Sequence, residues 1–217
     1  MLNQFLKLLC RVPRPWVLDS DFTIVESARA RATGYSFPSG HTQNAVGTFG
    51  GIARLTRRRW LRVIAIAAAV LVPFSRMYLG VHTPLDVGVA AVTAVIFVFG
   101  FYPLTERSES RPALIGWLIA VMALLSAAYV LFVSLWHFPA DTDAANLASG
   151  VENGWKLLGA TLGMLLAWWL DTRYIHFDTR AVWYVQLLKL AGGLVLLLAI
   201  RAVLKAPLAA LLGAQVG

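Results

Sequence analysis

Long apolar stretches separated by short polar joints constrain the fold of this chain more than any other feature. A helix needs about 20 mostly apolar residues to cross the hydrocarbon core of a bilayer. Five stretches are read as such spans: 60–79, 85–104, 112–136, 155–170 and 181–203. A sixth stretch, 41–55, is shorter and rich in Gly, Ala and Thr, which favours close packing between helices. The pattern predicts an all-α, polytopic transmembrane helix bundle with about six spans.

The composition agrees with a membrane protein. Of the 217 residues, 59% are hydrophobic and 14% are charged, and the mean hydropathy is +0.68. A net charge of +8 raises the question of nucleic acid, but the arginines cluster in the joints between apolar stretches, so we expect no nucleic-acid partner. The single cysteine, Cys10, excludes an intramolecular disulfide and has no companion for a metal cluster.

The arginine-rich joints predict the orientation. Alternate joints at 54–62, 105–111 and 171–180 carry the arginines and are expected on the cytoplasmic side. The joints at 35–41, 80–84 and 137–154 then face outward, toward the periplasm in a cell that has one. The sequence therefore predicts a multi-pass protein of the plasma or cytoplasmic membrane. It does not indicate an oligomeric state.

No repeat, low-complexity tract or linker divides the chain, so we expect a single membrane-embedded domain over residues 1–217. The opening residues, 1–15, are too short and too interrupted by charge and proline to cross the bilayer. They are read either as a half-span or as the remainder of a chain that starts late. No cleavable signal peptide is evident in them.

Three polar clusters lie on the predicted outward side, and each contains groups that suit an anion. Lys7 and Arg14 are seven residues apart, which places both on one side of a helical segment. Ser39, Gly40 and His41 follow Pro38 in a turn at the start of a helix, where unpaired N–H groups and the helix dipole favour an anion.

The third cluster contains Arg76, His82 and Asp86. Thr83 and Pro84 are predicted to be the N-cap and the first residue of a helix, which puts Asp86 in its first turn. The carboxylate could then hold one nitrogen of His82 protonated and leave the other free as a nucleophile or base. Together the clusters would surround one small space with cations, helix-end amides and imidazoles, an inventory that fits a phosphate-like anion best.

In order along the chain, the motifs Lys-x6-Arg-Pro, Pro-Ser-Gly-His and Ser-Arg-x5-His-x3-Asp resemble the three-part signature of the type-2 phosphatidic acid phosphatase (lipid phosphate phosphatase) superfamily. The fixed positions are all present, within residues 7–86. They are Lys7, Arg14, Pro15, Pro38, Ser39, Gly40, His41, Ser75, Arg76, His82 and Asp86. Further transmembrane helices are expected over 112–205. Membrane members usually have two or three helices before the first motif, so the later spans could fill the missing positions.

The resemblance implies a role for each residue. His82 would attack phosphorus and form a phosphohistidine, Asp86 would orient it, and His41 would protonate the leaving oxygen and then activate water. The phosphoryl oxygens would be held by Lys7, Arg14, Ser39, Gly40 and Arg76. No cofactor and no metal is implied, and the sequence lacks the paired carboxylates of a magnesium site at this face. Lipid carriers such as undecaprenyl diphosphate, phosphatidate or phosphatidylglycerophosphate suit the predicted headgroup-level site equally.

The same residues could instead have purely structural roles. Lys7 and Arg14 could anchor an interfacial helix to lipid headgroups, and Arg76 could be an end-of-span arginine. Asp86 could complete a capping box with Thr83, which is compatible with orienting His82. Arg29 and Arg31 are read as solvated, although they could steer an anion. Two rival functions are a lipid-phosphate binder or transporter without turnover, and a vanadate-dependent haloperoxidase-like enzyme.

Overall fold

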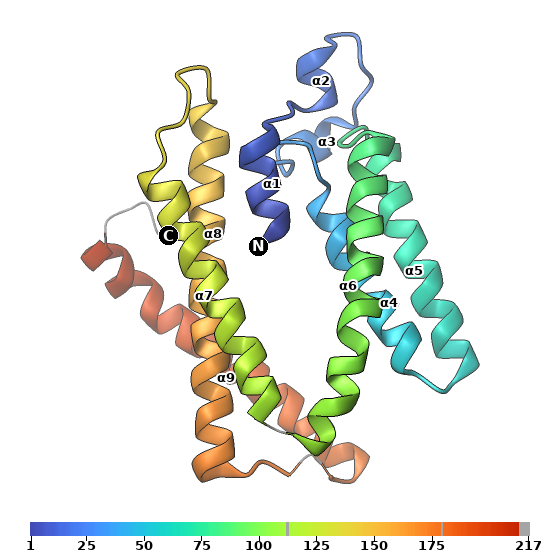
Figure 1. Cartoon of the computed structure of the whole chain (residues 1–217), viewed down its shortest axis with the longest axis vertical. Helices are drawn as coiled ribbons and strands as arrows, with labels where there is room; N and C mark the ends of the chain where they lie inside the picture. Colours follow the sequence, from blue (N-terminus) through green and yellow to red (C-terminus); the bar gives the residue numbers. More distant parts are fainter. Residues whose placement is uncertain (112, 179, 213–217) are drawn as a thin grey trace. The chain divides into compact units, whose positions relative to one another are not determined.

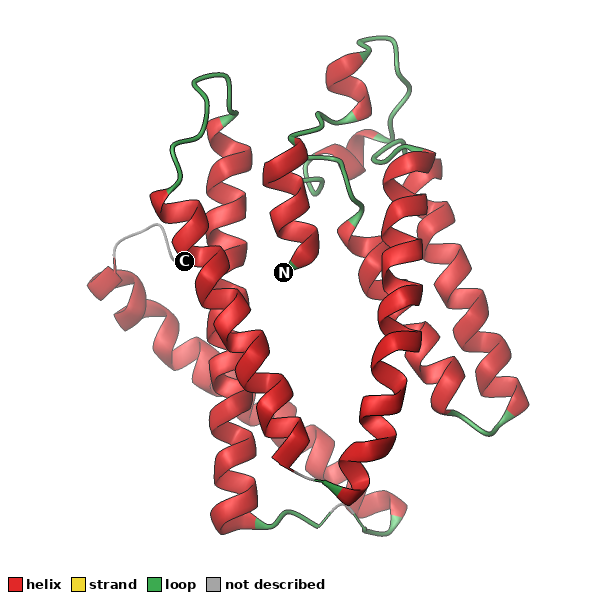
Figure 2. Cartoon of the chain, in the orientation of Figure 1, coloured by secondary structure: helices red, strands yellow, loops and turns green. Residues whose placement is uncertain are grey.

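The computed structural model describes residues 1–111, 113–178 and 180–212, and these residues form helices and loops without a strand (Figure 2). The prediction of an all-α fold is confirmed. Pro112, the first residue of the predicted 112–136 span, lies outside the described residues. The helices are α1 (Leu2–Cys10), α2 (Pro15–Leu18), α3 (Glu26–Arg29), α4 (Gly40–Leu55), α5 (Arg59–Tyr78), α6 (Pro84–Ser110), α7 (Ala113–Leu135), α8 (Ala144–Leu170), a π-helical turn η1 (Asp171–Ile175) and α9 (Trp183–Leu212).

The chain divides into two compact units. The first, Met1–Leu166, contains α1 to α7 and most of α8, and it holds every residue of the three motifs. The second unit begins at Ala167 and contains the end of α8, η1 and α9. The single domain over residues 1–217 stays a prediction.

Four helices in the described part of the chain are long and apolar enough to cross a membrane. They are α5, residues Pro84–Leu104 of α6, α7, and residues Trp183–Leu204 of α9. At most a third of each span is buried inside the protein, which suits helices that contact lipid. The other two predicted stretches, 41–55 and 155–170, lie on α4 and α8. Helix α1 has nine residues and is too short to cross the bilayer.

Helix α4 packs against α5 and α6 (Figure 1). Ala45 of α4 and Ala90 of α6 are buried, and a Cβ on Gly50 would lie 3.6 Å from a methyl group of Val98 on α6. A Cβ on Gly47 or Gly51 would meet nothing within 4 Å. The close packing predicted for the small residues of 41–55 therefore applies to one face of α4 and not to all of its glycines.

Helix α8 begins at Ala144, within the polar joint 137–154 and well before the predicted span 155–170. The Asp143 side chain accepts a 2.7 Å hydrogen bond from the N–H of Asn146, as an N-cap residue does. Leu147 and Val151 pack against the buried cluster around Leu8. This apolar stripe, at helical spacing, lets an otherwise polar segment fold as helix.

Candidate functional site

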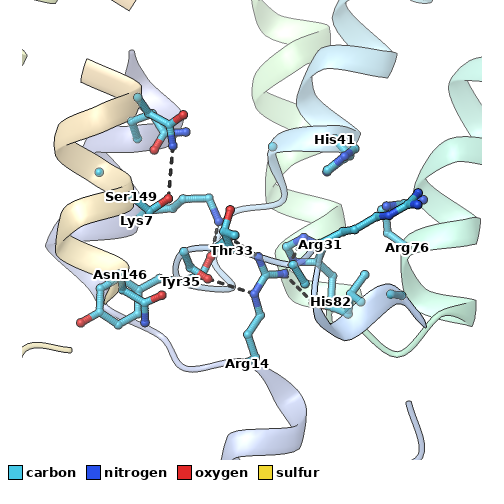
Figure 3. A pocket seen from close by; sticks show the side chains of 18 of the residues that line it. Lys7, Arg14, Arg31, Thr33, Tyr35, His41, Arg76, His82, Asn146 and Ser149 are labelled. Atoms are coloured by element: carbon cyan, nitrogen blue, oxygen red, sulfur yellow. Dashed lines mark hydrogen bonds between the residues drawn. The ribbon is translucent and has the colours of Figure 1, made fainter. Parts of the chain in front are cut away.

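The three motifs border one cavity of about 600 Å³ in the first unit (Figure 3). Six of the eight predicted site residues line it: Lys7, Arg14, Gly40, His41, Arg76 and His82. The other two, Ser39 and Asp86, are buried with exposed fractions of 0% and 1% and do not line the cavity. Both imidazoles therefore border the same space, which is the arrangement the sequence predicted.

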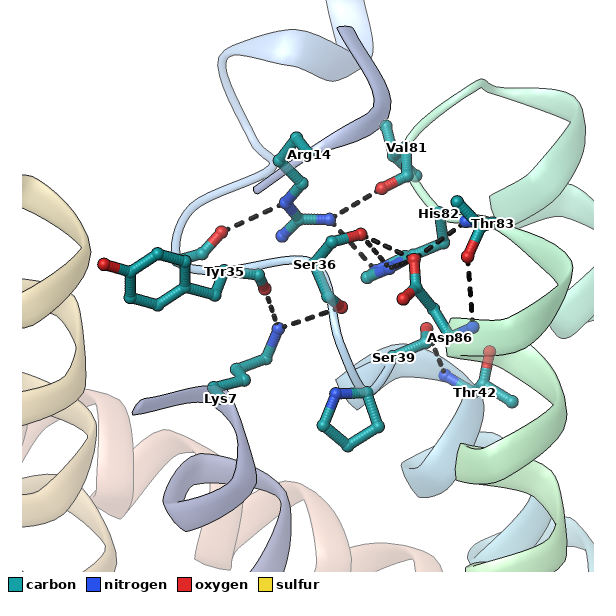
Figure 4. A network of polar contacts seen from close by, with 12 residues as sticks. Lys7, Arg14, Tyr35, Ser36, Ser39, Thr42, Val81, His82, Thr83 and Asp86 are labelled. Carbon is teal, nitrogen blue, oxygen red and sulfur yellow. Dashed lines mark hydrogen bonds and ion pairs between the residues drawn. The ribbon is translucent and has the colours of Figure 1, made fainter. Parts of the chain in front are cut away.

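Arg14 ties the segment after α3 to the turn that carries His82 (Figure 4). Its guanidinium donates to the carbonyl oxygens of Gly34, Thr33 and Val81 at 3.0, 2.8 and 2.8 Å. Nη1 also lies 3.1 Å from Nε2 of His82. Burial lowers the pKa of Arg14 to about 10, so the group is still a cation at neutral pH. An interfacial anchor would point to headgroups, whereas this arginine is fixed inside the protein.

Lys7 is also buried, with 8% of its surface exposed. Its Nζ donates to the carbonyl oxygen of Tyr35 and, at 3.4 Å, to that of Ser36. Burial, followed by the nearby charge of Arg14, lowers the pKa of Lys7 to about 7, and the charge of Asp86 opposes this shift. The charge of Lys7 is therefore sensitive to pH in the physiological range.

The contacts of His82 define its tautomer. Nδ1 lies 3.4 Å from Oδ2 of Asp86 and 3.4 Å from Oγ of Ser36. Because an arginine can only donate, Nε2 accepts from Arg14, and the proton of the neutral ring is on Nδ1. Burial lowers the pKa of His82 to about 4, although its hydrogen bond to Asp86 acts in the opposite direction. The ring is neutral at pH 7, with its basic nitrogen on the side of Arg14.

Asp86 completes a capping box and also contacts His82. Its Oδ2 accepts a 2.8 Å hydrogen bond from the N–H of Thr83, and its own N–H donates to Oγ1 of Thr83 at 3.2 Å, which is a capping box. The same oxygen accepts a 2.6 Å hydrogen bond from Oγ of Ser36 and faces His82. Thr83 and Pro84 begin α6 as predicted.

The start of α4 presents backbone donors to the cavity. Ser39 is the N-cap, and its Oγ accepts a 3.4 Å hydrogen bond from the N–H of Thr42. The hydroxyl thus caps the helix in this structure, and its role as a phosphate ligand stays a prediction. Gly40 and His41 occupy the first two helical positions, where N–H groups have no partner inside the helix. The Ser39 N–H donates to the carbonyl oxygen of Asp86 at 3.1 Å, which joins the second motif to the third.

Figure 3 shows Arg31 and Arg76 between His41 and the level of His82. Arg76 is half-buried, and its Nε is 3.5 Å from Oγ of the adjacent Ser75. Arg31 is exposed, in agreement with its interpretation as a solvated residue, and it also lines the cavity, where it could steer an anion. Arg29 remains at the surface, paired with Glu26 at 2.9 Å. The sequence contains no signal that separates the two, because the direction of each side chain depends on the loop around α3.

A turn that requires glycine leads to His82. Gly80 has φ +72°, and a Cβ there would lie 2.6 Å from the carbonyl oxygen of Thr23. Both facts require glycine, since other residues rarely adopt this conformation and the clash is with backbone. The adjacent Leu79 carbonyl accepts a 3.2 Å hydrogen bond from the N–H of Val25. The segment before α3 therefore packs on the turn that leads to His82.

Sequence reasoning missed two parts of this site. Ser36 is buried and bonded to Asp86, yet in the sequence it is an unremarked serine before the second motif. The other part is a face of α8, from which Asn146, Ser149 and Asn153 line the cavity. Among the residues that the structure describes, no group of three or more His, Cys, Asp or Glu could hold a metal ion. Metal independence stays a prediction.

The motif region matches a known family. The family model described as "PAP2 superfamily" matches residues 1–110, and a second, described as "PAP2 superfamily phosphatase, transmembrane extension", matches residues 155–216. With the four apolar helices, these matches identify an integral membrane protein. No solved structure matches the chain significantly.

Three curated proteins are similar over part of their length. An undecaprenyl-diphosphatase of Sulfolobus acidocaldarius is 47% identical over 57 residues, which are 26% of this chain and 27% of that protein. A lipid A 4'-phosphatase of Bacteroides thetaiotaomicron is 32% identical over 117 residues, 51% of this chain and 52% of that protein. The undecaprenyl-diphosphatase BcrC of Bacillus subtilis is 32% identical over 106 residues, 49% of this chain and 52% of that protein. The chain thus matches at most about half the length of these relatives.

Proposed function

The chain belongs to the PAP2 superfamily, and from this premise we propose that it is a phosphatase that hydrolyses a lipid phosphate monoester or diphosphate without a metal ion. The observation that carries the proposal is the single cavity lined by two imidazoles and by the motif cations Lys7, Arg14 and Arg76. Positive charges and helix-end N–H groups can stabilise a transferring phosphoryl group in place of a metal. The names of the relatives support a lipid phosphate as substrate.

The proposed reaction has two steps. In the first, Nε2 of His82 attacks phosphorus, the bond to the ester oxygen breaks, and His41 gives its proton to the departing oxygen. The products are a lipid alcohol, or a lipid monophosphate from a diphosphate, and a phosphohistidine. In the second, water attacks phosphorus while His41 takes its proton. The bond from phosphorus to nitrogen breaks and inorganic phosphate leaves, which restores both imidazoles.

The contacts of the two histidines suit these roles. His82 is neutral, its Nδ1 proton is held toward Asp86, and its Nε2 carries the lone pair. In the free protein this lone pair accepts from Arg14, so the attack requires the arginine to turn its N–H from Nε2 to a phosphoryl oxygen. His41 has no hydrogen-bond partner in the described part of the chain and borders the cavity, so its ring is available to a substrate oxygen. A group that only binds phosphate would need the cations and not this pairing of imidazole and carboxylate. This observation favours an enzyme over a lipid-phosphate binder or transporter.

We further propose that the site faces outward, at the level of the lipid headgroups. The arginine-rich joint between α4 and α5 lies at the opposite ends of these helices from the motif turns (Figure 1). Under the positive-inside rule, that joint is cytoplasmic and the cavity is on the other side. Undecaprenyl diphosphate, phosphatidate and phosphatidylglycerophosphate are all candidate substrates on this basis.

The test is phosphate release from short-chain lipid phosphates by purified wild type, His82→Ala and His137→Ala. His137 is exposed and does not line the cavity, so its variant is a matched control. We expect His82→Ala to lose turnover and His137→Ala to keep it. Equal release by all three would remove His82 from the mechanism. A binder without turnover would bind the lipids but release no phosphate, and loss of turnover in EDTA with rescue by magnesium would overturn metal independence.

A further inference from the structure

The cavity has a second wall, which carries no charge. From α8, the side chains of Asn146, Ser149 and Asn153 line it, and their spacing of three and four residues places them on one helix face. Figure 3 shows Asn146 and Ser149 on the opposite side of the pocket from His41, Arg76 and His82. None of these α8 residues belongs to the three motifs.

Two further amides continue this surface, Gln4 from α1 and Asn44 from α4. Gln4, Asn44 and Asn153 also line a smaller cavity of about 300 Å³. Asn3, which lines that smaller cavity, is 8% exposed, and its Oδ1 has no hydrogen-bond partner. We call the five residues that line the larger cavity the neutral wall. They are Gln4, Asn44, Asn146, Ser149 and Asn153.

The protein itself provides few hydrogen-bond partners for the side chains of the neutral wall. The side chains of Gln4, Asn44 and Asn146 have no hydrogen-bond partner among residues 1–111, 113–178 and 180–212. Gln4 and Asn146 are half-buried at the cavity, and Asn44 is exposed. Asn153 donates to Ser149 only at 3.5 Å. Polar groups in such positions are usually paired with water or a ligand. A carboxamide both donates and accepts hydrogen bonds, so a hydroxyl group can pair with its N–H groups and with its oxygen, whereas an ionised phosphate can only accept and an acyl chain can do neither.

We infer that the neutral wall binds an uncharged, hydroxyl-bearing group next to the scissile phosphate, namely a sugar or a glycerol. The inference rests on the proposed function, because it takes the phosphate to be held between His41 and His82. The volume of about 600 Å³ leaves room for such a group beside the phosphate, since sites of roughly 300–1,000 Å³ hold ligands much larger than one anion. Phosphatidate and isoprenoid diphosphates present no free hydroxyl here and would leave the wall facing water.

The experiment compares kcat/KM for four substrates with wild type, Asn146→Leu and Asn153→Leu. Leucine keeps the side-chain volume and removes the hydrogen bonds. The substrates are a glycolipid phosphate, phosphatidylglycerophosphate, phosphatidate and undecaprenyl diphosphate. Glu152→Gln is the matched control, because Glu152 is on the same helix, is exposed and does not line the cavity. The melting temperature of each variant checks that it folds.

We expect wild type to prefer one of the two hydroxyl-bearing substrates, and which one it prefers identifies a sugar or a glycerol. Each leucine variant should lose about three- to tenfold in kcat/KM for that substrate, as expected for one lost hydrogen bond. Phosphatidate and the diphosphate should change less than twofold. Equal loss on all four substrates, or no loss on any, would overturn the inference and leave the phosphatase in place. Absence of turnover with every substrate would overturn the proposed function, and the inference with it.

Discussion

The two walls of the cavity differ in how their polar groups are held. The motif wall consists of the motif residues that line the cavity: Lys7, Arg14, Gly40, His41, Arg76 and His82. On it, Arg14 makes four polar contacts. Behind it, the buried Asp86 accepts from Ser36 and Thr83 while facing His82. On the neutral wall, Gln4 and Asn146 have no side-chain partner in the described part of the chain. The motif residues, which would act on the phosphate common to many lipids, are thus held in place by the protein. The side chains of the neutral wall, which would contact a substituent that varies between lipids, are free to form hydrogen bonds with it.

The largest loss of activity is expected from Asp86→Asn, which changes the residue that contacts His82. An amide cannot fix the Nδ1 proton of His82 as a carboxylate does, so Nε2 would lose its defined lone pair. In hydrolases with an Asp–His pair the corresponding change costs about 10⁴-fold in kcat, and we expect a loss of that order for every substrate. Steady-state kinetics provide the measurement. Asp141→Asn, which alters an exposed residue paired with Arg11 at 3.4 Å, is the control. Equal kcat for the two variants would contradict the role of Asp86.

Arg14→Lys tests whether the forked geometry matters more than the charge. Lysine cannot reach the carbonyls of Gly34, Thr33 and Val81 together, so His82 and the loop after α3 would lose their common anchor. A displacement of about 1 Å in an active site can cost about 10²-fold, which is the loss expected in kcat/KM. Arg29→Lys changes an exposed arginine paired with Glu26 and should have no such effect. If Arg14→Lys kept full activity, the positive charge of Arg14 and not its forked geometry would account for its role.

The pH dependence of anion binding tests Lys7. Its pKa of about 7 in the free protein means that binding an anion above this pH requires the uptake of a proton. Inhibition by sulfate, whose charge is constant over this range, should therefore be unchanged below about pH 6 and weaken by up to about tenfold per pH unit above pH 7. Lys7→Arg should flatten this profile, because arginine stays protonated. The same slope in both proteins would exclude Lys7 as the titrating group.

The smallest effect is expected from the packing that holds the neutral wall. A Cβ on Gly150 would lie 2.9 Å from Cδ1 of Leu8, whereas a Cβ on Gly159 of the same helix would meet nothing within 4 Å. Gly150→Ala should destabilise the protein by about 1–3 kcal/mol through overpacking between α8 and α1. Gly159→Ala should be neutral or stabilising, because alanine favours helix. Thermal unfolding in detergent measures both, and equal melting temperatures would show that α8 is not packed on α1 in this way.

Hydropathy and motif spacing predicted much of this molecule. Span-length apolar runs are a strong signal, and α5 and α7 begin and end within about a residue of their predicted bounds at 60–79 and 112–136. The placement of Thr83 and Pro84 was also predictable, because a cap and an N1 proline act locally. The cations and histidines could be assigned to one space only because they fall in ordered motifs.

What the sequence could not predict depends on tertiary packing. The first turns of α8 are polar on average, and their apolar stripe of Leu147 and Val151 has meaning only once α1 is in place to pack on it. That helix then supplies a wall of the cavity from outside the motifs. Ser36 was missed for the same reason, since its hydroxyl meets Asp86 across 50 residues of chain. Arg31 enters the cavity through the path of an irregular loop, for which the sequence contains no periodicity.

The central claim is that a phosphoryl group is transferred to Nε2 of His82. The most direct test is to quench the enzyme during turnover at alkaline pH, where phosphohistidine is stable, and to locate the added phosphoryl group by mass spectrometry of peptides. The account predicts the group on His82 in wild type and its absence in His82→Ala. With a diphosphate substrate, whose departing monophosphate depends least on the acid that His41 supplies, it predicts accumulation of the group in His41→Ala, because the second step lacks a base. A phosphoryl group on another residue, or turnover without any phosphorylated intermediate in both wild type and His41→Ala, would contradict it.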